Sequence, residues 1–355
     1  MQVTFYCNNV MRFASLHNVS SFAKFVKFGV ALCVSLLLVA FGVLPKCFAG
    51  DSFFSTNDKH SLQGVVVSNN AIALAVNIVA AEFVDITIAE PVGDEHDSTL
   101  LPKDAQKMQS SLVIYFNNSD AIFYKMCNKF SLNCLEIAKS DKFKHLVAEF
   151  EESEGIILNA DEPHFWLSPE LFAFALMSVS SVLQQNIPRH AETIKKNTAD
   201  ALFEMYPLFA ECKAAMQTCD ALPTFTVENP YENLNAIYRT KKYETLMDDP
   251  DEGVEKDAML AINKLNAKKQ QFCVLVPMFD GGEQNVYNDV NTAPAGLKPL
   301  LSKPDSAIKI GYVDFSGEGI NIMGGVDGYS LYILDVLKNI KKCSCKKPEE
   351  VELKK

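Results

Sequence analysis

The stretch with the most distinctive chemistry in this chain is residues 161–170, Asp-Glu-Pro-His-Phe-Trp-Leu-Ser-Pro-Glu. It places His164, whose imidazole can bind a metal ion at neutral pH, two residues before the only tryptophan, Trp166. Residues 168–170, Ser-Pro-Glu, have the N-cap and first-turn preferences of a helix start. The histidine is therefore expected on a short, stiff segment between ordered elements. A single histidine is more often structural than metal-bound, so the interpretation depends on further ligands.

Three apolar runs elsewhere in the chain are each followed by side chains that bind metals. These side chains are Glu95 and His96 after residues 83–88, Glu228 after residues 224–227, and Asp314 after residues 308–313. In parallel sheets, ligands bind outside the carboxyl ends of the strands. Two imidazoles with carboxylates suit Zn(II), Mn(II) or Fe(II), whereas Ca(II) prefers oxygen ligands throughout. We therefore expect one transition-metal site formed by these side chains and His164.

Each candidate ligand also has a structural interpretation. Glu95 can solvate a loop, and His96 can form a surface ion pair with its acidic neighbours. Glu228 can cap a helix that begins near Pro230. The shared position of the candidates at strand ends is what favours a metal site.

Alternating strand and helix patterns predict the elements that position these residues. The predicted strands are residues 62–67, 83–88, 111–116, 224–227, 273–278 and 308–313, and the predicted helices are residues 69–81, 102–108, 121–130, 188–216 and 329–340. Continuous apolar strands separated by helices indicate an α/β fold class with mainly parallel sheets.

The helix predicted at residues 188–216 is too long for an ordinary crossover between strands. It would extend about 40 Å at 1.5 Å per residue, with a kink at Pro207. We interpret it as a strut that joins two lobes. The predicted organisation is an N-terminal lobe at 50–186, a linking helix at 187–220, a C-terminal lobe at 221–345 and a tail at 346–355.

Residues 1–49 have the features of a secretory signal peptide. They contain four basic and no acidic residues, an apolar stretch at residues 28–44, and small residues before a cut after Ala49. An uncleaved membrane anchor is the alternative, although this stretch is at the short limit for a span. Met11 is a second candidate start. We expect cleavage and export to the periplasm.

Without this segment, the chain has 29 basic and 44 acidic residues, a formal net charge of −15. This charge argues against nucleic acid and anionic membrane surfaces as partners. Seven cysteines remain, and disulfides are expected in an oxidising compartment. The odd number leaves one thiol free or paired elsewhere. Cys343 and Cys345 are interpreted as a disulfide site with a spare thiol, and the pairing of Cys127, Cys134, Cys212 and Cys219 is left open.

Around its two histidine motifs the chain resembles the metal-binding periplasmic proteins of ABC transporters, the cluster A-I type, and most closely the Gram-negative zinc-uptake branch. The matching stretches are Pro91-Val92-Gly93 with Glu95-His96-Asp97, residues 101–105, residues 163–170, the long helix after Pro188, and Val313-Asp314-Phe315-Ser316-Gly317. The resemblance covers roughly residues 60–345 and is more specific in the first half.

The resemblance implies two α/β lobes joined by one long helix, with a single metal ion in the cleft. It implies His96 and His164 as ligands from the first lobe, Glu228 and Asp314 from the second, and delivery of the metal by a monomer to a membrane permease. It also implies a disulfide between Cys273 and Cys343.

The chain departs from the zinc branch at three places, one of which is the segment 232–257, where the usual Tyr-Gly pair is missing. Zinc-type members usually have histidine where this chain has Glu228, and manganese-type members often have glutamate there. The histidine-rich loop of zinc members is missing. Zn(II) is the expected metal and Mn(II) the alternative. A metal-dependent hydrolase is a weaker alternative, because neither an H-E-x-x-H nor a G-x-S-x-G motif occurs and four protein ligands would close the site. A metal-free adhesin is a further alternative, whose only support is Glu228 and the altered segment 232–257.

Overall fold

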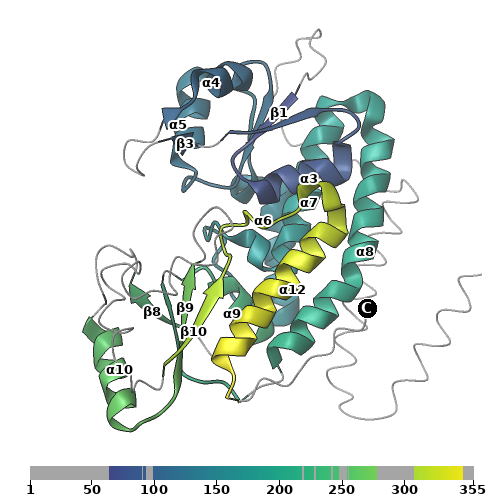
Figure 1. Ribbon diagram of the computed structural model, residues 1–355. Coiled ribbons are helices and arrows are strands. Elements are labelled where there is room, and N and C mark those ends of the chain that lie inside the picture. Colours follow the sequence, from purple (N-terminus) through teal and green to yellow (C-terminus); the bar gives the residue numbers. More distant parts are fainter. Residues whose placement is uncertain are drawn as a thin grey trace, which may run out of the picture. The chain divides into compact units, whose positions relative to one another are not determined.

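The computed structural model is shown in Figure 1. It describes residues 64–89, 91–92, 99–217, 220–227, 229–240, 243–247, 254, 256–277 and 308–346. The chain divides into two compact units, residues 1–59 and 60–355, and all described residues belong to the second unit. The predicted signal peptide lies outside the described residues. Among the helices that are described, none is both long and apolar enough to cross a membrane.

The first sheet is parallel and has the strand order β2-β1-β5-β6. Its strands are β1 (Gly64–Val67), β2 (Asp85–Ile88), β5 (Leu112–Tyr115) and β6 (Cys134–Glu136). All four residues of β1 are buried, as expected for a central strand with both faces covered. The associated helices are α3 (Asn70–Ala80), α4 (Pro102–Met108), α5 (Ala121–Phe130), α6 (Asp141–Glu154) and α7 (Pro169–Asn186). Two short strands, β3 (Pro91–Val92) and β4 (Thr99–Leu100), pair antiparallel on either side of residues 93–98.

The second sheet is also parallel and has the strand order β10-β9-β7-β8. Its strands are β7 (Thr224–Val227), β8 (Glu244–Met247), β9 (Phe272–Pro277) and β10 (Ile308–Val313), and its helices are α9 (Glu232–Tyr238), α10 (Lys256–Ala267) and α12 (Gly325–Ser344). Side chains of β9 alternate between the faces. Phe272, Val274 and Val276 join a core cluster with Ile262 of α10, whereas Cys273 is bonded to α12.

Helix α8 (Ala191–Gln217) follows the short 3-10 helix η3 (Pro188–His190) and lies against α3, α7 and α12 (Figure 1). It confirms the long helix predicted at residues 188–216. The helix continues through Pro207, and a kink at that residue stays a prediction. The confirmed fold class is α/β, with two mainly parallel sheets flanked by helices and a long helix between them in sequence. The exact lobe boundaries stay a prediction.

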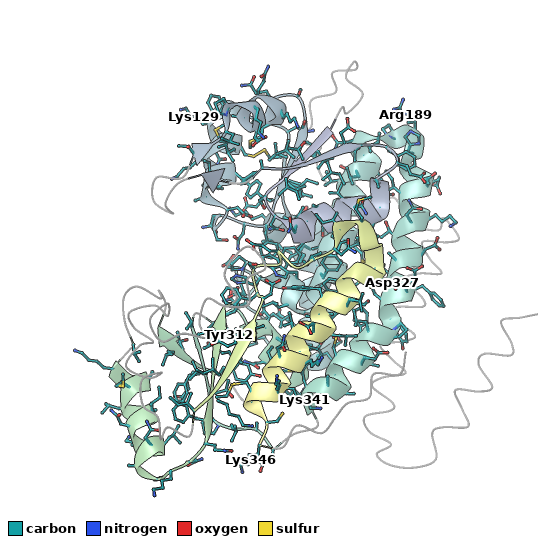
Figure 2. All side chains as sticks on the ribbon, in the orientation of Figure 1. Lys129, Arg189, Tyr312, Asp327, Lys341 and Lys346 are labelled. Atoms are coloured by element: carbon teal, nitrogen blue, oxygen red, sulfur yellow. A yellow bond between two sulfur atoms is a disulfide. The ribbon has the colours of Figure 1, made fainter. Side chains whose placement is uncertain are left out.

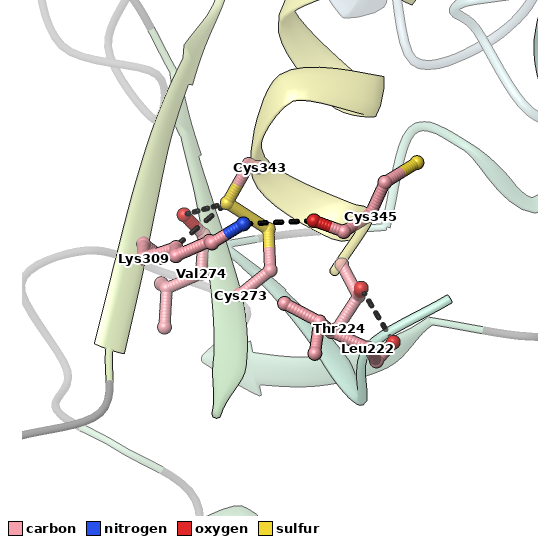
Figure 3. Close-up of a disulfide and its surroundings, with 7 residues drawn as sticks. All are labelled: Leu222, Thr224, Cys273, Val274, Lys309, Cys343 and Cys345. Atoms are coloured by element: carbon pink, nitrogen blue, oxygen red, sulfur yellow. Dashed lines mark hydrogen bonds between the residues drawn. A yellow bond between two sulfur atoms is a disulfide. The ribbon is translucent and has the colours of Figure 1, made fainter. Parts of the chain in front are cut away.

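Helix α12 packs closely on the second sheet and is bonded to it (Figure 3). Cys343 forms a disulfide with Cys273 of β9, as the family resemblance implied. Gly311 of β10 makes this approach possible, because a Cβ atom there would lie 2.7 Å from the Cβ of Cys343. Lys309 Nζ donates to the carbonyl of Cys345 at 2.7 Å. Lys346, two residues after α12 and labelled in Figure 2, forms an ion pair of 2.7 Å with Asp220.

The remaining cysteines only partly follow the expectation. Cys127 and Cys134 form a disulfide that links α5 to β6. Cys212 is the free cysteine among the described residues, and it is buried in α8. Cys345 is disulfide-bonded, so the interpretation of a spare thiol in the Cys343–Cys345 pair is wrong.

Candidate metal centre

His164 lies in the turn that leads into the 3-10 helix η2 (Phe165–Leu167), and its imidazole is held by Glu162. The distance from His164 Nδ1 to Glu162 Oε1 is 2.6 Å, and the backbone N–H of His164 donates to the same oxygen at 3.1 Å. Where the carboxylate accepts this bond, Nδ1 is the donor, and a neutral imidazole then has its lone pair on Nε2. A carboxylate behind a histidine is the usual support of a metal ligand. Glu162 therefore prepares Nε2 to bind a cation.

Two aromatic rings flank the His164 imidazole. Trp166 and Phe315 each meet it edge-on, with ring centroids 5.3 Å away in both cases. The indole N–H of Trp166 donates to the carbonyl of Phe315 at 3.1 Å, which connects two segments far apart in the sequence. The side chain of His164 retains 19% exposure. The ring is thus restricted on its sides while remaining open to a ligand.

Asp314 follows β10 and sits in a tight turn that fixes its carboxylate. Oδ1 accepts from the hydroxyl of Ser316 at 2.8 Å and from the N–H of Gly317 at 3.2 Å, and Oδ2 accepts from the N–H of Gly319 at 2.8 Å. Gly317 has a φ of +81°, a conformation that favours glycine. Both lone pairs of Oδ1 accept hydrogen bonds, whereas Oδ2 accepts one, so the turn orients the carboxylate and leaves a lone pair of Oδ2 for a cation.

The structure brings the His164 and Asp314 segments into contact, as the predicted site requires. Besides the Trp166–Phe315 bond, the hydroxyl of Tyr329 in α12 donates to the Trp166 carbonyl at 2.8 Å, and that of Tyr332 donates to the Asp314 carbonyl at 2.9 Å. The other predicted ligands, Glu95, His96 and Glu228, lie outside the described residues. Within the described ranges no three His, Cys, Asp or Glu side chains form a metal-binding group. The complete ligand set therefore stays a prediction.

Polar side chains at the end of the first sheet support the His164 segment, and no sequence motif indicated them. Asn117, just after β5, donates to the carbonyl of Asp161 at 2.6 Å. Asp120 accepts from the N–H of Phe116 at 2.8 Å and from the hydroxyl of Ser68 at 3.0 Å. Burial raises the pKa of Asp120 above its ordinary value. Asn117 thus ties the loop before His164 to the carboxyl end of β5, and Asp120 joins that end to the carboxyl end of β1.

The helix start predicted after His164 is confirmed and carries a second polar cluster. Ser168 caps α7, with its side chain accepting from Leu171 N–H, and Pro169 follows as the first helical residue. Glu170 Oε2 accepts from the hydroxyls of Ser168 at 3.1 Å and of Tyr238 at 3.2 Å. Burial raises the pKa of Glu170 to about 7. This cluster joins the start of α7 to the end of α9.

Comparison with protein families agrees with this geometry. The family model described as "Zinc-uptake complex component A periplasmic" matches residues 65–278, more than half of the chain. The chain belongs to this family. A search of curated protein sequences found no match.

Solved structures of low sequence identity share the fold. A ZnuA crystal structure has a TM-score of 0.58 at 11% identity, covering 79% of this chain and 99% of its own. Zn(II)-bound AdcA from Streptococcus pneumoniae has a TM-score of 0.57 at 14% identity, covering 82% of this chain and 60% of its own. An Mn-bound periplasmic metal-binding protein from Candidatus Liberibacter asiaticus has a TM-score of 0.53 at 16% identity, covering 78% and 98%. At these identities the likeness shows the fold, and the expected relationship to metal-binding substrate-binding proteins is confirmed through the family.

Proposed function

We propose that the protein captures Zn(II) between its two sheets and delivers it to the permease of an ABC transporter. The observation that carries this proposal is the Glu162–His164 pair, which leaves Nε2 of an aromatic-flanked imidazole ready to bind a metal. The proposed ligands are His96, His164, Glu228 and Asp314, with Glu95 as an additional oxygen donor. Two carboxylates would neutralise the charge of a divalent ion.

A binding protein fits the site better than an enzyme does. Four protein ligands would fill the coordination sphere of Zn(II), whereas catalytic zinc keeps a position open for water or substrate. Membership of a zinc-uptake family supports the same conclusion. It also supports a location outside the cytoplasm, for which we propose the periplasm after cleavage of the segment 1–49, and a permease as the partner of a monomeric protein.

The choice of metal rests on two opposing arguments. Zn(II) binds more tightly than Mn(II) to most nitrogen and oxygen sites, and imidazole suits it well. Glu228 supplies an oxygen, which makes Mn(II) the alternative. Solved relatives are described with Zn(II) and with Mn bound. We favour Zn(II) because two histidines remain in the proposed ligand set.

Metal analysis of the purified exported protein tests the proposal. Elemental analysis should find about one equivalent of Zn(II) in the wild type after loading and dialysis, as expected for a single closed site. His164→Ala should lose most of this metal. His145→Ala is the matched control, since His145 is an exposed histidine on α6 that pairs with Glu149, and it should retain the metal. A wild-type protein that binds no metal after loading would exclude the proposed function.

A further inference from the structure

A path of hydrogen bonds runs from α9 to the imidazole of His164. The side-chain amide of Asn233 pairs with both backbone groups of Asn159: Oδ1 accepts from the N–H at 2.8 Å, and Nδ2 donates to the carbonyl at 2.9 Å. The same carbonyl accepts from the N–H of Glu162 at 3.2 Å. Glu162 in turn accepts from Nδ1 of His164. The path therefore starts at Asn233 in α9, passes through Asn159 and Glu162, and ends at His164, the candidate ligand.

Asn233 is suited to this contact by its chemistry and its burial. An amide side chain offers a donor and an acceptor side by side, which matches the N–H and carbonyl of a single residue. Asn233 is 4% exposed, so its bonds form away from water, where an unmade bond is costly. Asn159 reinforces the contact from its own side, because its Nδ2 donates to Glu232 at 3.0 Å.

The loop that Asn233 holds needs such a restraint. Residues 155–164 connect α6 to η2 without regular secondary structure. Ile157 in this loop is 87% exposed, whereas Leu158 is buried and its N–H donates to Glu151 Oε1 at 2.6 Å, so the loop is packed at Leu158 only. Beyond Leu158, the side chains of Asn233 and Asn117 hold the backbone of Asn159 and Asp161 through hydrogen bonds. Loss of the hydrogen bonds from Asn233 or from Asn117 would let the Glu162 carboxylate move relative to the His164 imidazole.

We propose that Asn233 is a positioning residue for the metal, acting through Asn159 and Glu162 to fix the tautomer and orientation of the His164 imidazole. The proposal rests on the proposed function, because it assumes that His164 binds the metal. Helix α9 begins shortly after Glu228 in the sequence. The hydrogen bonds between Asn233 and Asn159 therefore link the segment that follows Glu228 to the loop that carries His164.

Two measurements on the full exported protein test this role. In metal-free protein labelled with ¹⁵N-histidine, the spectrum of His164, assigned with His164→Gln, should show a single Nδ1–H tautomer. Asn233→Ala should produce a mixture of tautomers. It should also weaken Zn(II) binding about tenfold or more, measured by chelator competition, as loss of a supporting hydrogen bond does at other metal sites. Asn233→Asp should give the same changes in a side chain of the same shape, because a carboxylate oxygen would face the Asn159 carbonyl in place of the donating amide.

Arg239→Met is the matched control. Arg239 also joins α9 to the region of α6, since its Nη2 donates to the carbonyl of Glu154 at 2.6 Å, but it lies off the path to His164. Its variant should retain the wild-type tautomer and affinity. The proposal is overturned if both Asn233 variants keep the wild-type tautomer and affinity, or if Arg239→Met changes them equally. A wild type that binds no metal would instead defeat the proposed function, while the tautomer comparison would still decide whether Asn233 positions His164.

Discussion

At the scale of single residues, the protonation of Glu170 is coupled to folding. Burial raises its pKa from 4.5 to about 7 in the folded chain, so the folded protein binds this proton more tightly than the unfolded chain does. The free energy of unfolding should therefore fall as pH rises from about 4.5 through 7, by up to about 3 kcal/mol. Glu170→Gln removes the ionisable proton and keeps the shape. It should be more stable than the wild type near pH 8 and similar to it near pH 5.

Urea unfolding at a series of pH values measures this difference. The groups facing Glu170 are Ser168, Tyr238, Cys212, Lys213 and Tyr329. All of them are present in both proteins, so the difference between the two curves isolates Glu170. Glu204→Gln is the control, because Glu204 is exposed on α8 and its variant should follow the wild-type curve. If the free energies of unfolding of Glu170→Gln and the wild type change in parallel with pH, ionisation of the Glu170 carboxyl does not destabilise the folded protein.

The sequence indicates contacts between residues that are close together in the chain. Asp161 and Glu162 both lie within three residues of His164, and Glu162 contacts the ring because it precedes His164 by two positions in one turn. Asp161 instead accepts from Asn117 through its backbone carbonyl. The contacts of Trp166 with Phe315, and of Asn159 with Asn233, depend on how distant segments fold together. No periodicity or spacing signals such pairs.

At the level of secondary-structure elements, the close packing of α12 on the second sheet depends on the absence of a side chain at Gly311. A Cβ atom there would lie 2.7 Å from the Cβ of Cys343 and 2.9 Å from Cδ2 of Leu275. The disulfide prevents α12 from moving away freely. Gly311→Ala should lower the free energy of unfolding by about 1–3 kcal/mol, the usual cost of overpacking a core. Denaturant titration measures it, and an unchanged midpoint would mean that the helix relocates without strain.

The elements that the sequence predicted are those with strong periodic or apolar patterns. The strands β7 and β10 and the helices α4 and α5 were predicted with their observed bounds, because each combines an apolar run with clear turn or helix-start residues. Strand β8 was missed, since Glu-Thr-Leu-Met has polar residues and lies at the edge of its sheet. Helix α9 was missed because seven residues give little helical periodicity. Yet α9 carries Asn233, so an element with a weak signal in the sequence supports the site.

At the scale of the whole molecule, metal binding and folding stability are linked. The proposed ligands come from both halves of the chain and are assembled only in the folded state. A ligand that binds only the folded protein adds about 2.7 kcal/mol when its free concentration is about 100 times its Kd. Zn(II) should therefore raise the thermal midpoint of the wild type and should leave His164→Ala nearly unchanged. A shift of equal size in both proteins would place the bound metal elsewhere.

The same thermal measurement tests which metal the site prefers. We expect Zn(II) to raise the wild-type midpoint more than Mn(II) does at equal free concentration, because it binds nitrogen and oxygen ligands more tightly. Glu228→His should increase the Zn(II) shift relative to the Mn(II) shift, since imidazole suits zinc and an oxygen ligand suits manganese. Glu244→His, on an exposed carboxylate of β8, is the control and should keep the wild-type ratio. If Glu228→His also keeps that ratio, residue 228 does not contact the metal, and the two halves of the chain meet at the ion through Asp314 alone.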